Sequence, residues 1–180
     1  MDKIRRFKLI LKKYPHYFQL IKNLKSYYKK KYQEYKNETK YLYLAALESL
    51  KAFLKGEIPI GCVLVSPDGK LFKAHNLKET LKDPTAHAEI LAIRKAANYY
   101  NTWFLQNFKI YITLEPCLMC FSCLIESRIT SVCYGYSEPK YGFSNFIEIE
   151  KFPKLVIRNL GLSDIAVPIK IFFKLIRCKK

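Results

Sequence analysis

The chain reads PTAHAE at residues 84–89 and LEPCLMC at residues 114–120, and these two stretches decide its fold. Each follows a segment typical of a turn or a strand and opens a segment typical of a helix. A His-x-Glu triplet or a Cys-x-x-Cys pair is a weak signal alone, because buried histidines and thiols are common. Two such stretches at two helix starts are more specific, and together they indicate a metal centre.

The surrounding pattern of apolar and turn residues predicts a series of alternating elements. We expect strands over residues 60–65, 71–75, 109–114, 131–136 and 152–158. We expect helices over residues 39–55, from Pro84 to about Asn98, over 117–127, and up to Arg177, with Asp83 capping the second and Ser163 or Asp164 the last. Helices that alternate with strands imply a layered α/β domain.

The chain divides into a basic extension, residues 1–38, and a better patterned remainder, residues 39–180. In the extension, apolar residues recur at helical spacing with lysines between them: Tyr17, Leu20, Ile21, Leu24, Tyr27 and Tyr28. This pattern predicts an amphipathic basic helix. Such a helix could grip RNA, lie on a membrane surface, or pack its tyrosines against the body, and we favour packing as the commonest use.

Length and charge limit the classes of protein. The chain has 180 residues, 50% of them hydrophobic, and a formal net charge of +17, which suits one domain with a real core. The charge fits a nucleic-acid partner, because Lys and Arg displace counterions from phosphates. A genome with AT-rich codons would also enrich Lys, Asn, Tyr, Ile and Phe, so charge alone leaves both explanations open.

Apolar runs and cysteines indicate where the protein works. No apolar run approaches the roughly 18 residues that a membrane span needs, so we expect no membrane partner. The close pair Cys117 and Cys120 suggests a metal site more than a disulfide framework. We therefore expect a cytoplasmic protein in a reducing compartment.

The two stretches contain a ligand set suited to zinc. Cys117 and Cys120 share one face of a helix, in the first turn, where the helix dipole favours thiolates. Together with His87 they make three ligands and leave the fourth tetrahedral position for water, as in catalytic zinc sites. Glu89 is two residues beyond His87, a spacing that does not make it a fellow ligand. It can instead carry the proton between the water and a substrate.

Two other residues are rival ligands. Cys123 continues the Cys-x-x-Cys spacing and could give three thiolates to zinc or to an iron–sulfur cluster. It lies one helical turn deeper, in an apolar run, so we favour a buried, inert thiol. His75 lies on a predicted hairpin strand away from the pair, and we rank it low.

Residues 41–177 resemble the bacterial-type tRNA-specific adenosine deaminases of the cytidine-deaminase-like superfamily. The run 83–90 looks like the family's zinc motif, 113–117 like its second motif and 56–61 like its pocket strand, while residues 127–129 and 172–173 also fit. The resemblance implies a three-layer α/β fold, with a central mixed sheet flanked by helices. The basic helical N-terminal extension has no counterpart in the family. Residues 39–180 would form the zinc-dependent deaminase domain.

The same resemblance implies hydrolytic deamination of adenosine to inosine at the wobble position of a tRNA anticodon. It implies one Zn²⁺ per subunit, the tRNA anticodon stem-loop as partner, and a homodimer. The residues that would contact the base are Asn76, the backbone of Ala88, Leu114 and Pro116. Candidate contacts to RNA phosphates are Lys140, Lys174 and Arg177.

Two alternatives stay open at this point. Guanine deaminases share a very similar first motif, so a free base or nucleotide of guanine or cytosine type is the second candidate substrate. A non-catalytic RNA-binding module with structural zinc, on three cysteines and His87, is the third hypothesis. The sequence also departs from the family's Asp-x-Lys-x-Gly loop, which reads Glu-Pro-Lys-Tyr-Gly at residues 138–142.

Overall fold

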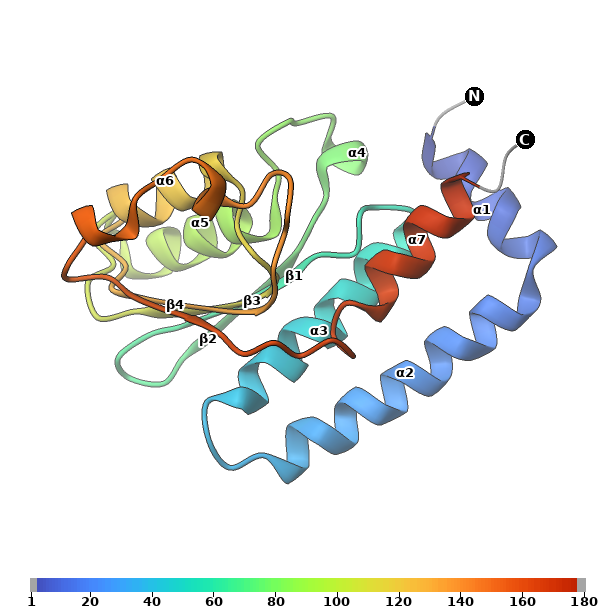
Figure 1. Cartoon of the computed structure of the whole chain (residues 1–180), viewed down its shortest axis with the longest axis horizontal. Helices are drawn as coiled ribbons and strands as arrows, with labels where there is room; N and C mark the ends of the chain where they lie inside the picture. Colours follow the sequence, from blue (N-terminus) through green and yellow to red (C-terminus); the bar gives the residue numbers. More distant parts are fainter. Residues whose placement is uncertain (1–2, 178–180) are drawn as a thin grey trace.

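A computed structural model describes residues 3–177, and a five-stranded mixed sheet lies at its centre, in the order β2-β1-β3-β4-β5 (Figure 1). β1 (Gly61–Val65) is antiparallel to both β2 (Leu71–His75) and β3 (Lys109–Leu114). β4 (Ser131–Tyr136) and β5 (Val156–Asn159) continue the sheet in parallel with β3. All of β1 is buried because helices cover both faces of the sheet.

Helices form the layers on either side of the sheet (Figure 1). α5 (Ala88–Tyr100) and α6 (Leu118–Glu126) cover one face, and α3 (Thr39–Lys55) and α7 (Val167–Arg177) cover the other. α2 (Pro15–Glu34) packs along the outer side of α3 and adds a further layer. The expected α/β architecture, with a mixed sheet between helices, is confirmed.

Alternate residues of β1 supply the two hydrophobic cores. Cys62 and Leu64 face the core under α5 and α6, whereas Val63 and Val65 face the core under α3 and α7. Because successive side chains of a strand point to opposite faces, one short apolar run serves both sides.

The basic extension is helical and packs on the body. α1 (Lys3–Lys13) buries Phe7, whose ring centroid lies 5.3 Å from Phe53 and 4.8 Å from Phe172. In α2, Tyr28 is fully buried and its hydroxyl donates to the backbone oxygen of Asp164 at 2.7 Å. The expectation that the tyrosines of this helix pack against the body is confirmed. None of the helices within residues 3–177 is long and apolar enough to cross a membrane.

The helix expected from Pro84 begins four residues later, at Ala88. The Asp83 carboxylate does accept the backbone N–H of Thr85, at 2.8 Å, but it closes a turn and does not cap a helix. A short polar side chain that bonds two residues onward offers the backbone this alternative. As a result His87 stands just outside the helix, as its N-cap residue.

The C-terminal elements also differ from expectation. β5 starts at Val156, not at residue 152, because Phe152 ends a short 3-10 helix (Ile149–Lys151) and its ring packs on Phe121, with centroids 5.9 Å apart. α7 begins at Val167 without Asp164 as its cap, since the Asp164 carboxylate accepts the hydroxyls of Tyr27 and Tyr43. The short helix α4 (Lys78–Leu81) was not expected from the sequence, and the helical extension is divided into two helices, α1 and α2.

Candidate active site

His87 is held at the N-terminal end of α5. Its backbone is extended (φ −75°, ψ 156°), and Ala88 and Glu89 begin the first helical turn. The segment before it is tied to the end of β2, because the N–H of Leu77 donates to the backbone oxygen of Ala86 at 3.0 Å. The imidazole therefore projects from a fixed point where a loop meets a helix.

Cys117 has the same position at the start of α6, with an extended backbone (φ −73°, ψ 168°). It comes shortly after β3, and its predecessor Pro116 accepts the N–H of Phe143 at 2.9 Å. Cys120 lies in the first turn of α6 and is fully buried. Because α5 and α6 lie on one face of the sheet, their N-terminal ends bring His87 to the two thiols (Figure 1).

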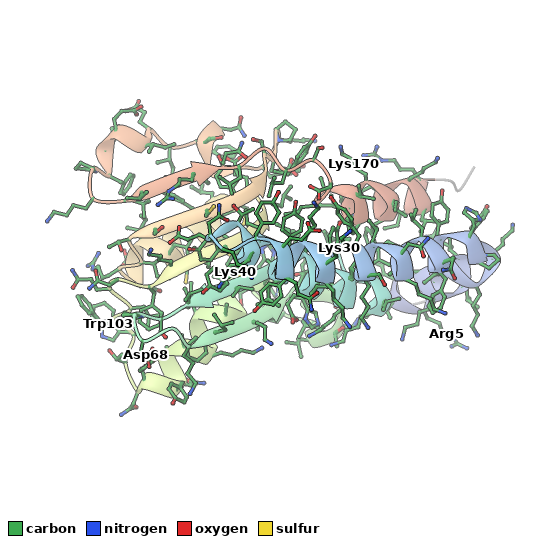
Figure 2. All side chains as sticks on the ribbon, turned by 90° about the horizontal axis from the view of Figure 1, so that it is seen from below. Arg5, Lys30, Lys40, Asp68, Trp103 and Lys170 are labelled. Carbon is green, nitrogen blue, oxygen red and sulfur yellow. The ribbon has the colours of Figure 1, made fainter. Side chains whose placement is uncertain are left out.

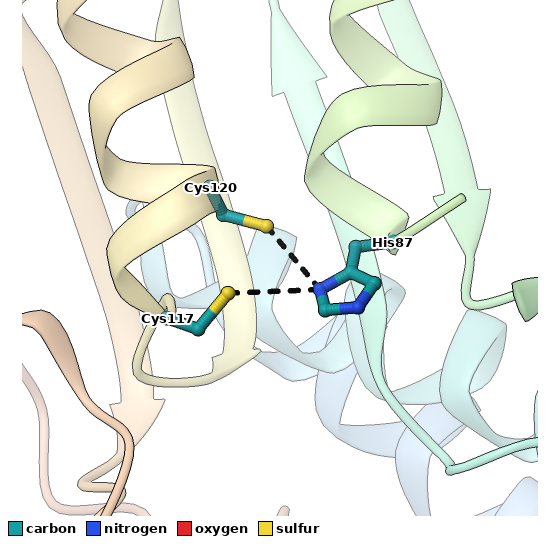
Figure 3. Close-up of side chains that lie close together, drawn as sticks. All are labelled: His87, Cys117 and Cys120. Carbon is teal, nitrogen blue, oxygen red and sulfur yellow. Dashed lines mark hydrogen bonds between the residues drawn. The ribbon is translucent and has the colours of Figure 1, made fainter. Parts of the chain in front are cut away.

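The three side chains converge on one point (Figure 3). His87 Nδ1 lies 3.7 Å from Cys117 Sγ and 3.5 Å from Cys120 Sγ. Tetrahedral zinc, with bonds of about 2.3 Å to sulfur and about 2.0 Å to nitrogen, would place these atoms roughly 3.6 Å apart. The three donor atoms lie within 4.8 Å of one another, and no other group of metal-ligating side chains within residues 3–177 comes together in this way. The observed geometry fits zinc.

The pKa values of the Cys117 and Cys120 thiols are also consistent with a bound metal ion. Hydrogen bonding by the Cys120 and His87 side chains lowers the pKa of Cys117 to about 4, against the effect of burial. The pKa of Cys120 is raised, because Cys117 carries the negative charge beside it and because Cys120 is buried. A bound dication deprotonates its thiol ligands outright. The site therefore needs a cation for both sulfurs to be thiolates.

Glu89 supplies an acid beside the cluster. It is only 3% exposed, and burial raises its pKa to about 7. Its Oε2 atom has no hydrogen-bond partner within residues 3–177. A buried polar atom without a partner is uncommon and points to a ligand or water that binds there. Glu89 is therefore suited to take up and return a proton near neutral pH.

The side chains expected to contact a base lie at one edge of the sheet. Asn76 follows the end of β2, and its backbone N–H donates to the Ile60 oxygen at 3.0 Å. Leu114 ends β3, and Pro116 follows it. Because β1 is antiparallel to β2 and β3, these ends meet beside the start of β1. Ala88, at the start of α5, is fully buried, and the other three are buried as well.

Two buried glutamates organise the loops around this edge, and sequence reasoning missed both roles. The Glu57 carboxylate accepts the Asn76 amide at 3.3 Å and the backbone N–H groups of Glu79 and Thr80 at 3.1 and 2.6 Å. The only sequence signal was its place in the run 56–61. Glutamates without exposed surface are uncommon unless they are paired, so this one indicates a structural task.

The second glutamate, Glu115, holds the loop that departs from the family pattern. Its carboxylate accepts the backbone N–H of Glu138 at 3.0 Å and of Ser144 at 3.1 Å. A Cβ atom on Gly142 would lie 2.5 Å from this carboxylate, so glycine is needed for the close approach. Gly142 also forms a β-bridge with Cys117. The loop is thereby fixed against the metal ligands.

The three candidate phosphate contacts are not in one place. Lys140 lies in the loop that Glu115 holds, and its Nζ stands 5.1 Å from the Tyr141 ring centroid. Lys174 and Arg177 lie in the last turns of α7, whose neighbours are α1 and α3. Figure 1 shows this end of α7 far from the start of α6. The structure therefore separates one loop lysine from the two residues of α7.

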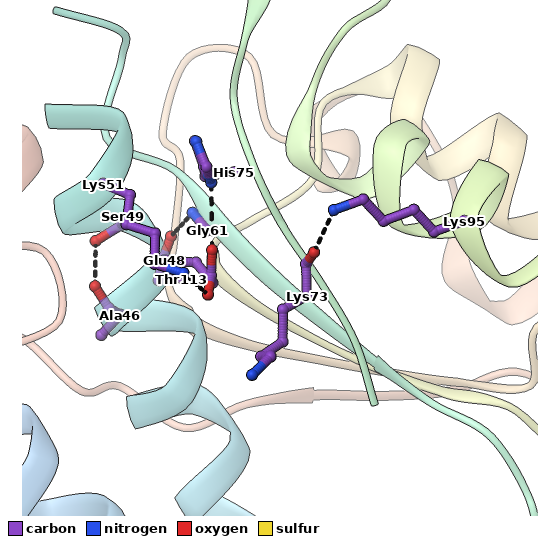
Figure 4. Close-up of polar contacts among 9 residues, drawn as sticks. All are labelled: Ala46, Glu48, Ser49, Lys51, Gly61, Lys73, His75, Lys95 and Thr113. Atoms are coloured by element: carbon purple, nitrogen blue, oxygen red, sulfur yellow. Dashed lines mark hydrogen bonds and ion pairs between the residues drawn. The ribbon is translucent and has the colours of Figure 1, made fainter. Parts of the chain in front are cut away.

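The two rival ligands lie outside the metal-ligating group. His75 Nδ1 lies 3.2 Å from Glu48 Oε2, so the ring is paired with an acid of α3 (Figure 4). Lys51 pairs with the same carboxylate at 2.6 Å. Cys123 is half-buried in α6 and does not join His87 in the group. Both observations agree with the expectation that neither residue is a ligand.

Comparison with known proteins decides the family. Residues 35–136 match the model of the cytidine and deoxycytidylate deaminase zinc-binding region. The chain belongs to this deaminase family. It is a zinc-dependent deaminase that takes one zinc ion per chain, and the His87, Cys117 and Cys120 group could hold that ion.

Curated relatives and a solved structure place the deaminase more closely. It is 38% identical over 146 residues to the tRNA-specific adenosine deaminase of Bacillus subtilis, a match that covers 78% of this chain and 91% of the relative. It is 46% identical over 102 residues to the tRNA-specific adenosine deaminase of Aquifex aeolicus, covering 57% of this chain and 68% of the relative.

A solved tRNA:A34 deaminase, from work on A-to-I editing at the wobble position of transfer RNA, has a similar fold. It superposes with a TM-score of 0.67 at 33% identity, over 73% of this chain and 99% of its own. This match agrees with the mixed sheet and flanking helices of the deaminase described here.

Proposed function

We propose that this deaminase hydrolyses adenosine to inosine at the wobble position of a tRNA anticodon. One observation carries the proposal. The metal-ligating group stands together with Glu89, whose Oε2 atom has no partner within residues 3–177, in a chain with curated relatives named tRNA-specific adenosine deaminase.

In this mechanism His87, Cys117 and Cys120 hold the zinc ion. Zinc, when bound at three protein ligands, supplies a water activated for attack at neutral pH. Glu89 would take one proton of that water at its Oε atoms and pass it to a ring nitrogen of the base, and would then carry the second proton to the leaving amine, which departs as ammonia. Its raised pKa, about 7, suits both directions of transfer, because an acid works best near the operating pH.

The target base would lie against the buried edge of the sheet. Glu57 accepts a hydrogen bond from the Asn76 amide and would hold it where it can hydrogen-bond the base. The backbone of Ala88 provides a second polar contact, and Leu114 and Pro116 provide apolar walls. A base can enter only after it leaves the stack of the anticodon loop, which costs little in a single-stranded segment.

The RNA backbone would be held by cationic residues in two places, one beside the site and one along α7. Lys140 lies in the loop that adjoins Cys117, and Lys174 and Arg177 extend the positive surface along α7. We propose these three side chains as phosphate contacts, because Lys and Arg release counterions from nucleic acid and strengthen binding at low salt.

We further propose that residues 39–180 form the deaminase domain, that residues 1–38 are an addition to it, and that the active form is a homodimer. Leu118 and Met119, directly beside Cys117, are 42% and 37% exposed, which is unusual for large apolar side chains at a site. A second subunit would cover them. Light scattering during gel filtration tests the dimer.

The free cysteines, together with a tRNA substrate, agree with a cytoplasmic location.

The proposal is tested with Glu89→Ala on an anticodon stem-loop that carries adenosine at the wobble position. We expect the variant to retain one zinc per chain and to form no inosine, as read by mass spectrometry. Glu126→Ala, which removes an exposed carboxylate from the end of α6, is the matched control and should keep full activity. An active Glu89→Ala enzyme would show that the proton is carried elsewhere.

A substrate panel separates the remaining candidates. The wild-type protein is supplied with free guanine, free cytosine and the adenosine stem-loop in parallel. Inosine in the RNA alone supports the proposal. Release of ammonia from a free base would identify a small-molecule deaminase, and no turnover with full zinc content would favour an RNA-binding module.

A further inference from the structure

A groove of about 320 Å³ lies where the extension meets the C-terminal helix, outside the site described above. α1 forms one wall and α7 forms the other, while the segment around Ile58 and the short helix α4 complete it. Among the residues that line it are Lys3, Arg6, Phe7, Gly56, Ile58 and Glu79. The groove exists only because residues 3–13 pack here.

The helix that forms one wall of this groove is strongly cationic. α1 has no acidic residue, and its basic residues are Lys3, Arg5, Arg6, Lys8, Lys12 and Lys13. Lys170, Lys174 and Arg177 of α7 line a separate hollow, and Figure 2 shows Lys170 and Arg5 at opposite edges of this end of the molecule. The cations that line the groove are therefore Lys3 and Arg6, both from α1.

Most of this charge is available to a ligand. Glu79 is the one acid among the residues that line the groove, and it pairs with Lys3 at 3.1 Å. The Lys3 side chain is 79% exposed, and exposed ion pairs contribute little, so a phosphate can replace this partner. Arg6 pairs with no acidic side chain within residues 3–177. A guanidinium of this kind is suited to bidentate contact with phosphate.

The apolar side chains of α1 indicate whether its anionic partner is a nucleic acid or a lipid membrane. A helix that lies on a membrane places its apolar face among the lipids. Phe7, the central apolar residue of α1, is instead buried between Phe53 and Phe172. Its anchoring face is therefore occupied by the body of the protein, and its cations remain at the surface. This arrangement favours a nucleic-acid backbone over a lipid surface.

The groove adjoins the edge of the sheet where the base is expected to bind. Gly56 and Ile58 line it, while Glu57, between them, points inward and accepts the Asn76 amide. Glu79 lines it as well, and its backbone N–H donates to the same Glu57 carboxylate at 3.1 Å. An RNA strand that runs from the expected base-binding edge across residues 56–58 would reach α1 directly.

We propose that α1 is an RNA-binding arm, and that the groove between α1 and α7 takes the sugar–phosphate backbone of the tRNA next to the edited nucleotide. Arg6 and Lys3 contact the phosphates. This inference rests on the proposed function, since it names a second contact region for the same substrate. It also gives the basic extension a role besides packing.

The experiment compares two charge reversals that change the net charge equally. Arg6→Glu alters the groove, whereas Lys29→Glu alters an exposed lysine of α2, away from it. Binding of each full-length protein to a labelled anticodon stem-loop is measured by fluorescence anisotropy over a range of salt concentrations. We expect Arg6→Glu to raise Kd by at least about fivefold and to lower the salt slope by about 1, as for the loss of a phosphate contact.

The remaining readouts separate a contact from a structural effect. Arg6→Lys should bind the stem-loop with an affinity much closer to that of the wild type than Arg6→Glu does. The single-turnover rate at saturating RNA should stay at the wild-type value for all variants. Equal Kd values for Arg6→Glu and Lys29→Glu would overturn the inference. So would a loss of binding to phosphatidylglycerol vesicles with RNA binding unchanged, which would identify a lipid surface as the partner.

Failure of this inference differs from failure of the proposed function. If the wild-type protein forms inosine but Arg6→Glu binds RNA as Lys29→Glu does, only the role of α1 is wrong. If the wild-type protein forms no inosine, the proposed activity is wrong, and the comparison of Kd values still decides whether the groove binds RNA.

Discussion

The Asn76 amide donates to the Glu57 carboxylate, with Nδ2 and Oε2 3.3 Å apart, and both side chains are buried. The same carboxylate accepts the backbone N–H groups of Glu79 and Thr80, in the segment that leads from β2 towards His87. One acid thus fixes the direction of the Asn76 amide, which we propose as a base contact, and the course of the loop before His87.

Replacing this acid should weaken both stability and substrate binding. In Glu57→Gln, an NH₂ group takes the place of one acceptor oxygen and leaves a buried N–H without a partner, at a cost of about 1–3 kcal/mol. We expect a lower melting temperature and a higher KM for the stem-loop, with zinc content unchanged. Glu150→Gln, at an exposed position, is the control. A wild-type KM in Glu57→Gln would contradict the role given to the Asn76 amide.

Zinc content should distinguish the two cysteines of α6. Cys120 Sγ lies 3.5 Å from His87 Nδ1, whereas Cys123 is outside the metal-ligating group. Cys120→Ser should lose the metal and with it the activity, because the third ligand is removed. Cys123→Ser should keep one zinc per chain, measured by mass spectrometry of the metal after gel filtration. Loss of zinc from Cys123→Ser would instead support a three-cysteine site.

Local patterns were sufficient to predict four of the five strands closely, and also the pairing of Cys117 with Cys120, whose spacing puts both at the start of α6. The approach of His87 to this pair was predicted from the two motifs together, since each opens a helix. The hairpin of β1 and β2 was equally evident, because its turn and its apolar alternation lie within a few residues.

Contacts with distant partners could not be predicted in this way. Glu57 and Glu115 act on backbone N–H groups about twenty residues away, and only the folded loops bring these donors to them. The start of α5 was placed too early because the carboxylate of Asp83 bonds within its own turn. The extension was expected to be helical, but the packing of α1 was not predicted, since Phe7 contacts Phe172 at the other end of the chain.

Acid should weaken a buried pair beneath β2. Burial raises the pKa of Glu48, but hydrogen bonds from His75 and Lys51 outweigh it and hold the pKa below its usual value (Figure 4). Because the folded-state pKa is the lower one, the stabilisation is present above the unfolded-state pKa of about 4.3 and is lost as pH falls through the folded-state value.

The measurement is the melting temperature of the wild type and Glu48→Gln between pH 7 and pH 3. We expect the wild type to be the more stable at pH 7, by about 1–3 kcal/mol, because a buried charged partner of His75 is lost in the variant. The difference should shrink as the pH falls below the unfolded-state pKa. If the difference in stability between the wild type and Glu48→Gln stayed constant to pH 3, the charge of Glu48 would not stabilise the fold.

The attachment of the extension should depend on Tyr28 more than on its neighbour Tyr27. The buried Tyr28 hydroxyl donates to the Asp164 backbone oxygen at 2.7 Å, whereas Tyr27, 38% exposed, donates to the Asp164 carboxylate at 3.0 Å. Tyr28→Phe leaves a carbonyl oxygen without this donor in a place that water reaches poorly, so we expect it to cost about 1–3 kcal/mol. Tyr27→Phe should cost less than about 1 kcal/mol, because water can replace its hydroxyl. Urea denaturation of both variants measures the difference, and equal effects would mean that α2 is held by its apolar contacts alone.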